Sequence, residues 1–175
     1  MPLEDMAIAS GAEAMSDTSH PFYDMHAHGF VRVATATPCH RTADIAFNIK
    51  GILAEAHKAH EQNVDLVVYP ELCVSSYAID DLHLQNAILD ASEKAIRTLA
   101  EATADISPVL VVGAPLRRNA KIYNCAVVIA GGEVLGVIPK SYLPNYREFY
   151  EKRYFAHGRN CQDLWIGVNG EEVPF

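Results

Sequence analysis

The stretch VDLVVYPELCVSSYAIDD, residues 64–81, carries the strongest fold signal in the sequence. Its apolar run at residues 66–69 is short and has no polar alternation, which predicts a strand buried on both faces of a sheet. Pro70 cannot donate a hydrogen bond to a sheet and should end the strand. Glu71 follows directly, at the kind of strand end where open α/β sheets bind ligands.

Amphipathic helices are predicted on both sides of this stretch. The first begins near Asp44, with Thr42 or Asp44 available as the N-cap, and ends within residues 61–65. The second follows the Glu71 loop and places an apolar stripe over residues 89–103. A half-buried strand is expected before the first helix, at residues 30–36.

Valine-rich runs follow the second helix at residues 109–116, 123–130 and 133–138. The RRNAK and GG segments between them favour tight turns, so the three runs are expected to be adjacent strands. A further hairpin is predicted at the C-terminus, between DLWIGV and GEEVPF. Strands alternating with helices and then strands in succession predict an α/β fold, with helices covering at least one side of the sheet.

Composition limits the class of protein. The 175 residues are 50% hydrophobic, which suits one globular domain, and the net charge of −8 without a basic stripe argues against nucleic acid as a partner. No apolar run has a membrane helix's length, and the acidic start lacks the basic region of a signal peptide. We therefore expect a soluble, cytoplasmic protein, with a flexible leader at residues 1–20 and the folded domain at residues 21–175.

No metal site is expected. The histidine pairs at residues 26 and 28 and at residues 57 and 60 have no evident third ligand. The cysteines are too far apart in sequence for a C-x-x-C pair and are expected to be free thiols. They are Cys39, Cys73, Cys125 and Cys161.

Two charged residues occupy matching positions. Glu71 in VVYPEL and Lys140 in GVIPKS each follow a proline that ends an apolar strand. This parallel predicts that the two side chains lie close together at one end of the sheet. Pairing would lower the cost of burying both charges and would keep the carboxylate ionised, as a general base requires. The residues alone leave a plain structural salt bridge equally open.

A third charged cluster lies in KSYLPNYREFYEKRYF, residues 140–155. Glu148 and Glu151 stand there among several tyrosines and phenylalanines. That many aromatic side chains could shape a pocket. They could also belong to a surface loop that covers the edge of the core.

Several of these segments resemble signatures of a known family. YPELCVSSY, IYNCAVVI, EVLGVIPKSYLP and YREFYEKRYFAHG look like successive motifs of the nitrilase, or carbon–nitrogen hydrolase, superfamily. PELCVSSYAIDDL and LPNYREFYEKRYF are most similar to the glutaminase domain of glutamine-dependent NAD synthetases. The resemblance runs from about residue 29 to the C-terminus, and it implies a nitrilase-like α-β-β-α sandwich that is C-terminally truncated here.

The resemblance also implies roles for individual residues. Glu71 matches the general base, Lys140 the lysine that stabilises the oxyanion, and Glu148 a second, supporting glutamate. Tyr146 matches the residue that contacts glutamine. The family's nucleophilic cysteine has no match, since the resemblance places it beyond Phe175, and neither Cys161 nor Cys73 is a good substitute. As a fragment, the chain is expected to be inactive.

The implied reaction is hydrolysis of the glutamine amide, in which a cysteine thiolate attacks and ammonia leaves. In complete synthetases an ATP-dependent ligase domain uses that ammonia to amidate nicotinic acid adenine dinucleotide to NAD. ATP and Mg would belong to that ligase domain, with no cofactor in this chain, and the partners would be glutamine, the ligase domain and further copies of the complete protein. Two alternatives remain: another amidase of the superfamily, or a truncated, non-catalytic interaction module in which Glu71 and Lys140 merely form a salt bridge.

Overall fold

The computed structural model describes residues 20–161 and 164–175. The chain divides into two compact units, Met1–Val31 and Arg32–Phe175. In the first unit the described residues form two short 3-10 helices, η1 (Pro21–Tyr23) and η2 (His26–His28). The leader predicted at residues 1–20 lies outside the described residues, apart from His20.

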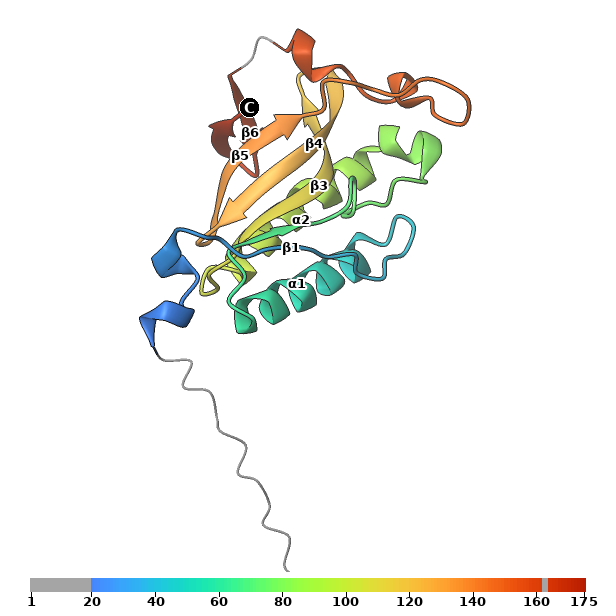
Figure 1. Cartoon of the computed structure of the whole chain (residues 1–175). Helices are drawn as coiled ribbons and strands as arrows, with labels where there is room; N and C mark the ends of the chain where they lie inside the picture. Colours follow the sequence, from blue (N-terminus) through green and yellow to red (C-terminus); the bar gives the residue numbers. More distant parts are fainter. Residues whose placement is uncertain (1–19, 162–163) are drawn as a thin grey trace, which may run out of the picture. The chain divides into compact units, whose positions relative to one another are not determined.

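The second unit is built on a mixed five-stranded sheet whose strands follow one another in sequence order (Figure 1). Parallel pairing joins the first three strands, and antiparallel hairpins join the last three. The α/β class and the adjacent valine-rich strands are thus confirmed. The strands are β1 (Val33–Thr35), β2 (Leu66–Val68), β3 (Val109–Arg118), β4 (Lys121–Ala130) and β5 (Glu133–Pro139).

One irregularity changes the register between β4 and β5. Ile129 pairs with Val134, whereas Val128 pairs with Gly136, so the intervening Leu135 is an extra residue in β5. Such a β-bulge shifts all later pairs of the strand by one position. Beyond the bulge the ladder continues without a break to Cys125 opposite Pro139.

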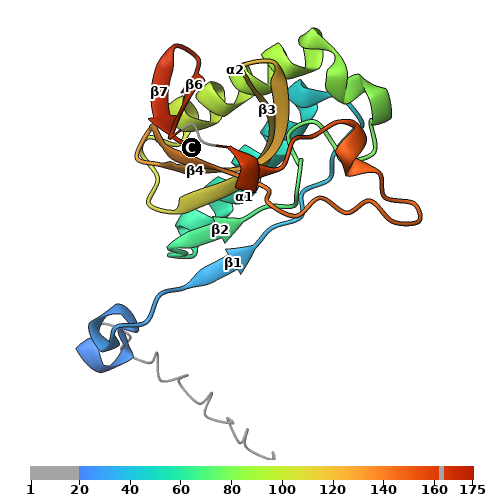
Figure 2. The same cartoon turned by 90° about the horizontal axis from the view of Figure 1, so that it is seen from above.

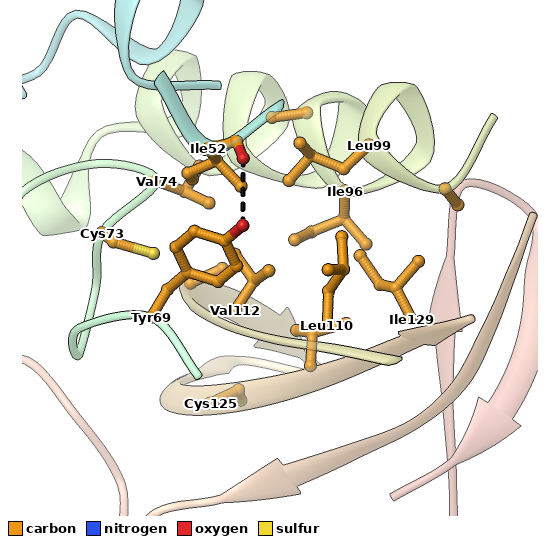
Figure 3. Packing of buried hydrophobic residues seen from close by; sticks show 14 of the residues in the cluster. Ile52, Tyr69, Cys73, Val74, Ile96, Leu99, Leu110, Val112, Cys125 and Ile129 are labelled. Carbon is orange, nitrogen blue, oxygen red and sulfur yellow. Dashed lines mark hydrogen bonds between the residues drawn. The ribbon is translucent and has the colours of Figure 1, made fainter. Parts of the chain in front are cut away.

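Helices α1 (Ile45–Glu61) and α2 (Asn86–Ala102) contact each other and lie over one face of the sheet (Figures 1 and 2). Of the two N-cap candidates, Asp44 caps α1, because its Oδ1 accepts a hydrogen bond from the Phe47 amide. The main core fills the space between these helices and strands β3 and β4 (Figure 3). Its fully buried members include Ile52, Ile96, Leu99, Leu110 and Ile129.

The prediction that β2 is buried on both faces is wrong. Val67 is completely buried beneath the helices, but Val68 on the opposite face is exposed. The helices cover only one face, and no described element covers the other face at β2. The first strand is also shorter than expected, since only Val33–Thr35 pairs with β2.

The remaining elements are short. The chain between β2 and α2 forms η3 (Asp80–Leu84), and the chain after β5 forms η4 (Glu151–Arg153) and η5 (Gly158–Asn160). The predicted C-terminal hairpin is present as β6 (Trp165–Val168) paired with β7 (Glu171–Pro174). Among the described residues, no helix combines the length and apolarity that crossing a membrane requires.

Candidate active site

Glu71 and Lys140 meet at one end of the sheet, as the sequence predicts. Two antiparallel pairings separate β3 from β5, so β5 runs in the same direction as β2 and both strands finish at the same end. Lys140 Nζ lies 2.7 Å from Glu71 Oε1. The charged residues that follow the two strand-ending prolines therefore lie next to each other.

This contact needs an explanation, because β2 and β5 are three strand spacings apart in the sheet, or about 14 Å. The turn after β2 crosses the face of β3 at Gly113. A Cβ atom at Gly113 would lie only 2.6 Å from Pro70 O, and the Val74 amide donates to Gly113 O at 3.1 Å. A residue without a side chain thus lets the turn pass over β3 and carry Glu71 toward β4.

Asn124 in β4 holds both charged residues. Its Nδ2 donates to Glu71 Oε1, and its backbone carbonyl accepts a 2.8 Å hydrogen bond from the Lys140 amide. Asn124 is buried, so its own side of both bonds is shielded from water. Asn124 was not among the predicted site residues, and its only signal in the sequence was a polar side chain at the start of the valine-rich run.

Glu151 provides a second carboxylate for Lys140. Its Oε1 lies 2.9 Å from Lys140 Nζ and accepts another hydrogen bond, also 2.9 Å, from the Tyr77 hydroxyl. The Glu151 side chain is only 4% exposed, against 27% for Lys140 and 41% for Glu71. The lysine therefore stands between one buried and one accessible carboxylate.

The electrostatics keep Lys140 charged. Partial burial alone would lower the pKa of Lys140, but the hydrogen bonds to Glu71 and Glu151 outweigh it and raise the pKa above its ordinary value. Burial, followed by the hydrogen bond to Glu151, raises the pKa of Tyr77. The tyrosine is thus a neutral donor and the lysine an ammonium group at neutral pH. This arrangement presents a fixed positive charge beside an accessible carboxylate.

A second close approach fixes the backbone of Lys140. A Cβ atom at Gly158 would lie 3.0 Å from the Pro139 Cβ and closer still to the Pro139 carbonyl. The Gly158 amide donates to Lys140 O at 2.9 Å. The intervening loop is anchored on a small buried cluster of Leu72, Leu143 and Phe155. Pro70 and Pro139, which precede Glu71 and Lys140, are thus each approached closely by a glycine.

Glu148 and Tyr146 lie in that loop but form no hydrogen bond or ion pair with Glu71, Lys140 or Glu151. Glu148 lines a neighbouring pocket of about 190 Å³, to which Glu151 and Tyr77 also contribute. Tyr146 is 72% exposed, is not among the residues that line this pocket, and has the Arg147 guanidinium 5.3 Å from its ring centre. Their roles in supporting catalysis and in glutamine binding stay predictions. Sequence alone gave no reason to prefer Glu151, three residues after Glu148, as the partner of Lys140.

Two cysteines near the core are poorly suited to act as nucleophiles. Cys73 is buried with its thiol 3.6 Å from Gly113 O, and burial raises the pKa of that thiol to about 11. Burial also raises the pKa of Cys125. Within residues 20–161 and 164–175, no group of three histidine, cysteine or acidic side chains is placed to hold a metal ion.

Comparison with known proteins agrees with this geometry. The family model described as carbon–nitrogen hydrolase matches residues 32–170. The chain is 49% identical over 154 residues to the glutamine-dependent NAD(+) synthetase of Mycobacterium bovis and 37% identical over 132 residues to that of Aquifex aeolicus. These matches cover 88% and 75% of this chain, which spans only 22% and 23% of those two proteins.

A solved structure shows the same relationship in three dimensions. The crystal structure of a glutamine-dependent NAD(+) synthetase from Cytophaga hutchinsonii superposes with a TM-score of 0.75 at 29% identity. The superposition covers 83% of this chain and 25% of that one. The chain belongs to the carbon–nitrogen hydrolase family, with homology to the glutaminase domain of glutamine-dependent NAD synthetases.

Proposed function

We propose that Glu71 and Lys140 serve in hydrolysis of the glutamine amide, the reaction that supplies ammonia to glutamine-dependent NAD synthetases. The observation that carries the proposal is the 2.7 Å pair at the end of the sheet, in which an ammonium group lies beside an accessible carboxylate. Homology at 49% identity to a protein named for this activity points the same way.

In the proposed reaction a cysteine thiolate attacks the amide carbon and a tetrahedral oxyanion forms. Lys140 stabilises the oxyanion, while Glu71 moves the proton that lets ammonia leave and then assists the water that hydrolyses the thioester. Glu151 holds the lysine in place from its buried side. The thiolate would come from the cysteine that the family resemblance places after Phe175, and the buried thiols of Cys73 and Cys125 are poorly suited to replace it.

The remaining parts of the proposal concern the complete protein. An ATP-dependent ligase domain that binds ATP and Mg would receive the ammonia and amidate nicotinic acid adenine dinucleotide to NAD, and the complete protein would form a homo-oligomer. The sheet would form one layer of an α-β-β-α sandwich. The exposed apolar residues Val68, Leu135 and Ile138 support a second layer, because they give another sheet an apolar surface to cover.

The test is an ammonia-release assay with glutamine. The 175-residue chain is compared with a version that extends past the expected cysteine and with the Glu71→Gln variant of that version. We expect turnover only in the extended protein, and a loss of about 100-fold or more in Glu71→Gln, because it lacks the general base. The matched control is Glu61→Gln, an exposed glutamate at the end of α1, which should keep full activity. Equal turnover of the short and extended chains would instead assign the nucleophile to a cysteine within this sequence.

A further inference from the structure

Both hydrogen bonds to the Glu71 side chain end on the same carboxylate oxygen. Lys140 Nζ donates to Glu71 Oε1 at 2.7 Å, and Asn124 Nδ2 donates to that oxygen as well. A carboxylate oxygen offers about two lone pairs, so the two donors occupy the acceptor capacity of Oε1. Among the described residues, none donates to Oε2. Oε2 is therefore the oxygen of Glu71 that stays available to accept a proton.

Asn124 anchors this carboxylate to the sheet. The residue lies within β4, opposite Pro115 of β3, and is 3% exposed. Its backbone carbonyl accepts the 2.8 Å hydrogen bond from the Lys140 amide. Glu71 lies in a turn, and its side chain is 41% exposed. A buried side chain in a strand thus holds a more accessible side chain in a turn.

Lys140 does not set the orientation of Glu71 as closely as Asn124 does. Its ammonium group is a rotatable donor on a flexible stem, and Glu151 shares it at 2.9 Å. The side-chain amide of Asn124 is planar, and its NH₂ group must face Glu71, because an ionised carboxylate only accepts hydrogen bonds. The direction of the Asn124 bond therefore fixes which of the two carboxylate oxygens is held against the sheet.

We propose that Asn124 is a positioning residue for the glutamine hydrolysis. By holding Oε1 it leaves Oε2 as the oxygen of Glu71 that moves the proton. Oε2 takes the proton of the cysteine thiol as the S–C bond forms and gives it to the leaving nitrogen as the C–N bond breaks, while Asn124 keeps its own protons. The inference rests on the proposed function and deepens it, since Asn124 acts through Glu71 and not on glutamine itself.

The test compares two substitutions of Asn124 in the protein extended past the expected cysteine, assayed for ammonia release at neutral pH. Asn124→Ala removes the donor, so kcat should fall by about tenfold to a hundredfold with little change in KM, because a misplaced catalytic group costs rate more than binding. Asn124→Asp keeps the size but sets a second carboxylate against Oε1, so kcat should fall by about a further tenfold or more. The matched control is Asn86→Ala, an exposed asparagine of α2, which should keep full kcat.

The order of the two variants separates positioning from packing. If Asn124 only filled space, the isosteric Asn124→Asp would be the milder change and Asn124→Ala the more damaging one. Full kcat in folded Asn124→Ala, or a higher kcat in Asn124→Asp than in Asn124→Ala, would therefore overturn the proposal. Urea unfolding shows whether each variant is folded.

A second measurement needs neither turnover nor a change at Asn124. In the 15N-labelled 175-residue chain, a side-chain amide proton of Asn124 should resonate downfield because its acceptor is charged, and Glu71→Gln should move it upfield while Glu61→Gln leaves it in place. If neither Asn124 variant folds, this resonance decides, and an unchanged resonance in Glu71→Gln would overturn the proposal. No turnover in the unsubstituted extended protein would instead refute the proposed function, whatever the resonance shows.

Discussion

Replacing Lys140 with methionine should destabilise the protein far more than neutralising Glu71. In Lys140→Met the Glu151 carboxylate stays buried, with a 4% exposed side chain, but loses its only ion-pair partner in the described structure. Leaving one charge of a buried pair uncompensated costs about 3–5 kcal/mol. We therefore expect the free energy of unfolding to fall by that amount.

The companion variants make the expectation specific. In Glu71→Gln, Lys140 keeps its bond to Glu151, and the lost carboxylate is 41% exposed, so we expect a loss of about 1 kcal/mol or less. The double variant Lys140→Met, Glu151→Met removes the stranded charge altogether. It should recover most of the stability, because apolar side chains often replace a buried ion pair without loss.

Urea unfolding followed by circular dichroism measures all three variants, and equal m-values confirm that the midpoints can be compared. Equal losses of stability in Lys140→Met and Glu71→Gln would refute the expected cost of a stranded Glu151 charge. A double variant no more stable than Lys140→Met would refute it as well. Either result would mean that Glu151 is not an ionised, lysine-dependent carboxylate.

Three further predictions concern the surroundings of the site. Gly113→Ala should cost about 1–3 kcal/mol, because the added methyl group overlaps the turn that carries Glu71, whereas Gly167→Ala, with nothing within 4 Å, should be nearly neutral in the same urea assay. His83 has a lowered pKa, so below its ordinary value of 6.5 the unfolded chain binds a proton that the folded chain does not. Stability should thus fall as the pH drops below 6.5, and His83→Gln should reduce that slope in unfolding midpoints measured across the acidic range. In mass-spectrometric labelling with iodoacetamide, exposed Cys39 should react, while buried Cys73, with its pKa raised to about 11, should react only after unfolding; rapid native labelling of Cys73 would contradict its assigned burial.

Much of the fold could be predicted because its signals are local. The N-cap at Asp44, the apolar stripe of α2 and the turns between the valine-rich strands depend on residues close together in sequence. The meeting of Glu71 and Lys140 could also be predicted, since each follows a proline that ends a strand, and strand ends are where open α/β sheets bind ligands.

The rest depends on contacts between distant parts of the chain. Lys140 pairs with Glu151 rather than with Glu148 because of the path that the loop takes over the cluster of Leu72, Leu143 and Phe155. The spacing of the two glutamates in the sequence does not reveal that path. Asn124 acquires its role only when β4 lies between the Glu71 turn and Lys140. The burial of β2 was overestimated because an apolar run does not reveal whether a second layer covers its outer face.

The extra residue at Leu135 has a consequence far from its own position. Beyond the bulge, residues opposite each other in β4 and β5 continue to Lys140 opposite Asn124, and opposed residues project from the same face of a sheet. If Leu135 were paired with Val128 instead of bulging, every later pair would slip by one and Lys140 would lie opposite Tyr123, whose side chain is buried in the core. The register near the start of β5 therefore decides on which face of the sheet Lys140 lies at its end. A one-residue insertion in β5 beyond the bulge would leave Glu71, Lys140 and Glu151 in the sequence and still turn the lysine away from both carboxylates.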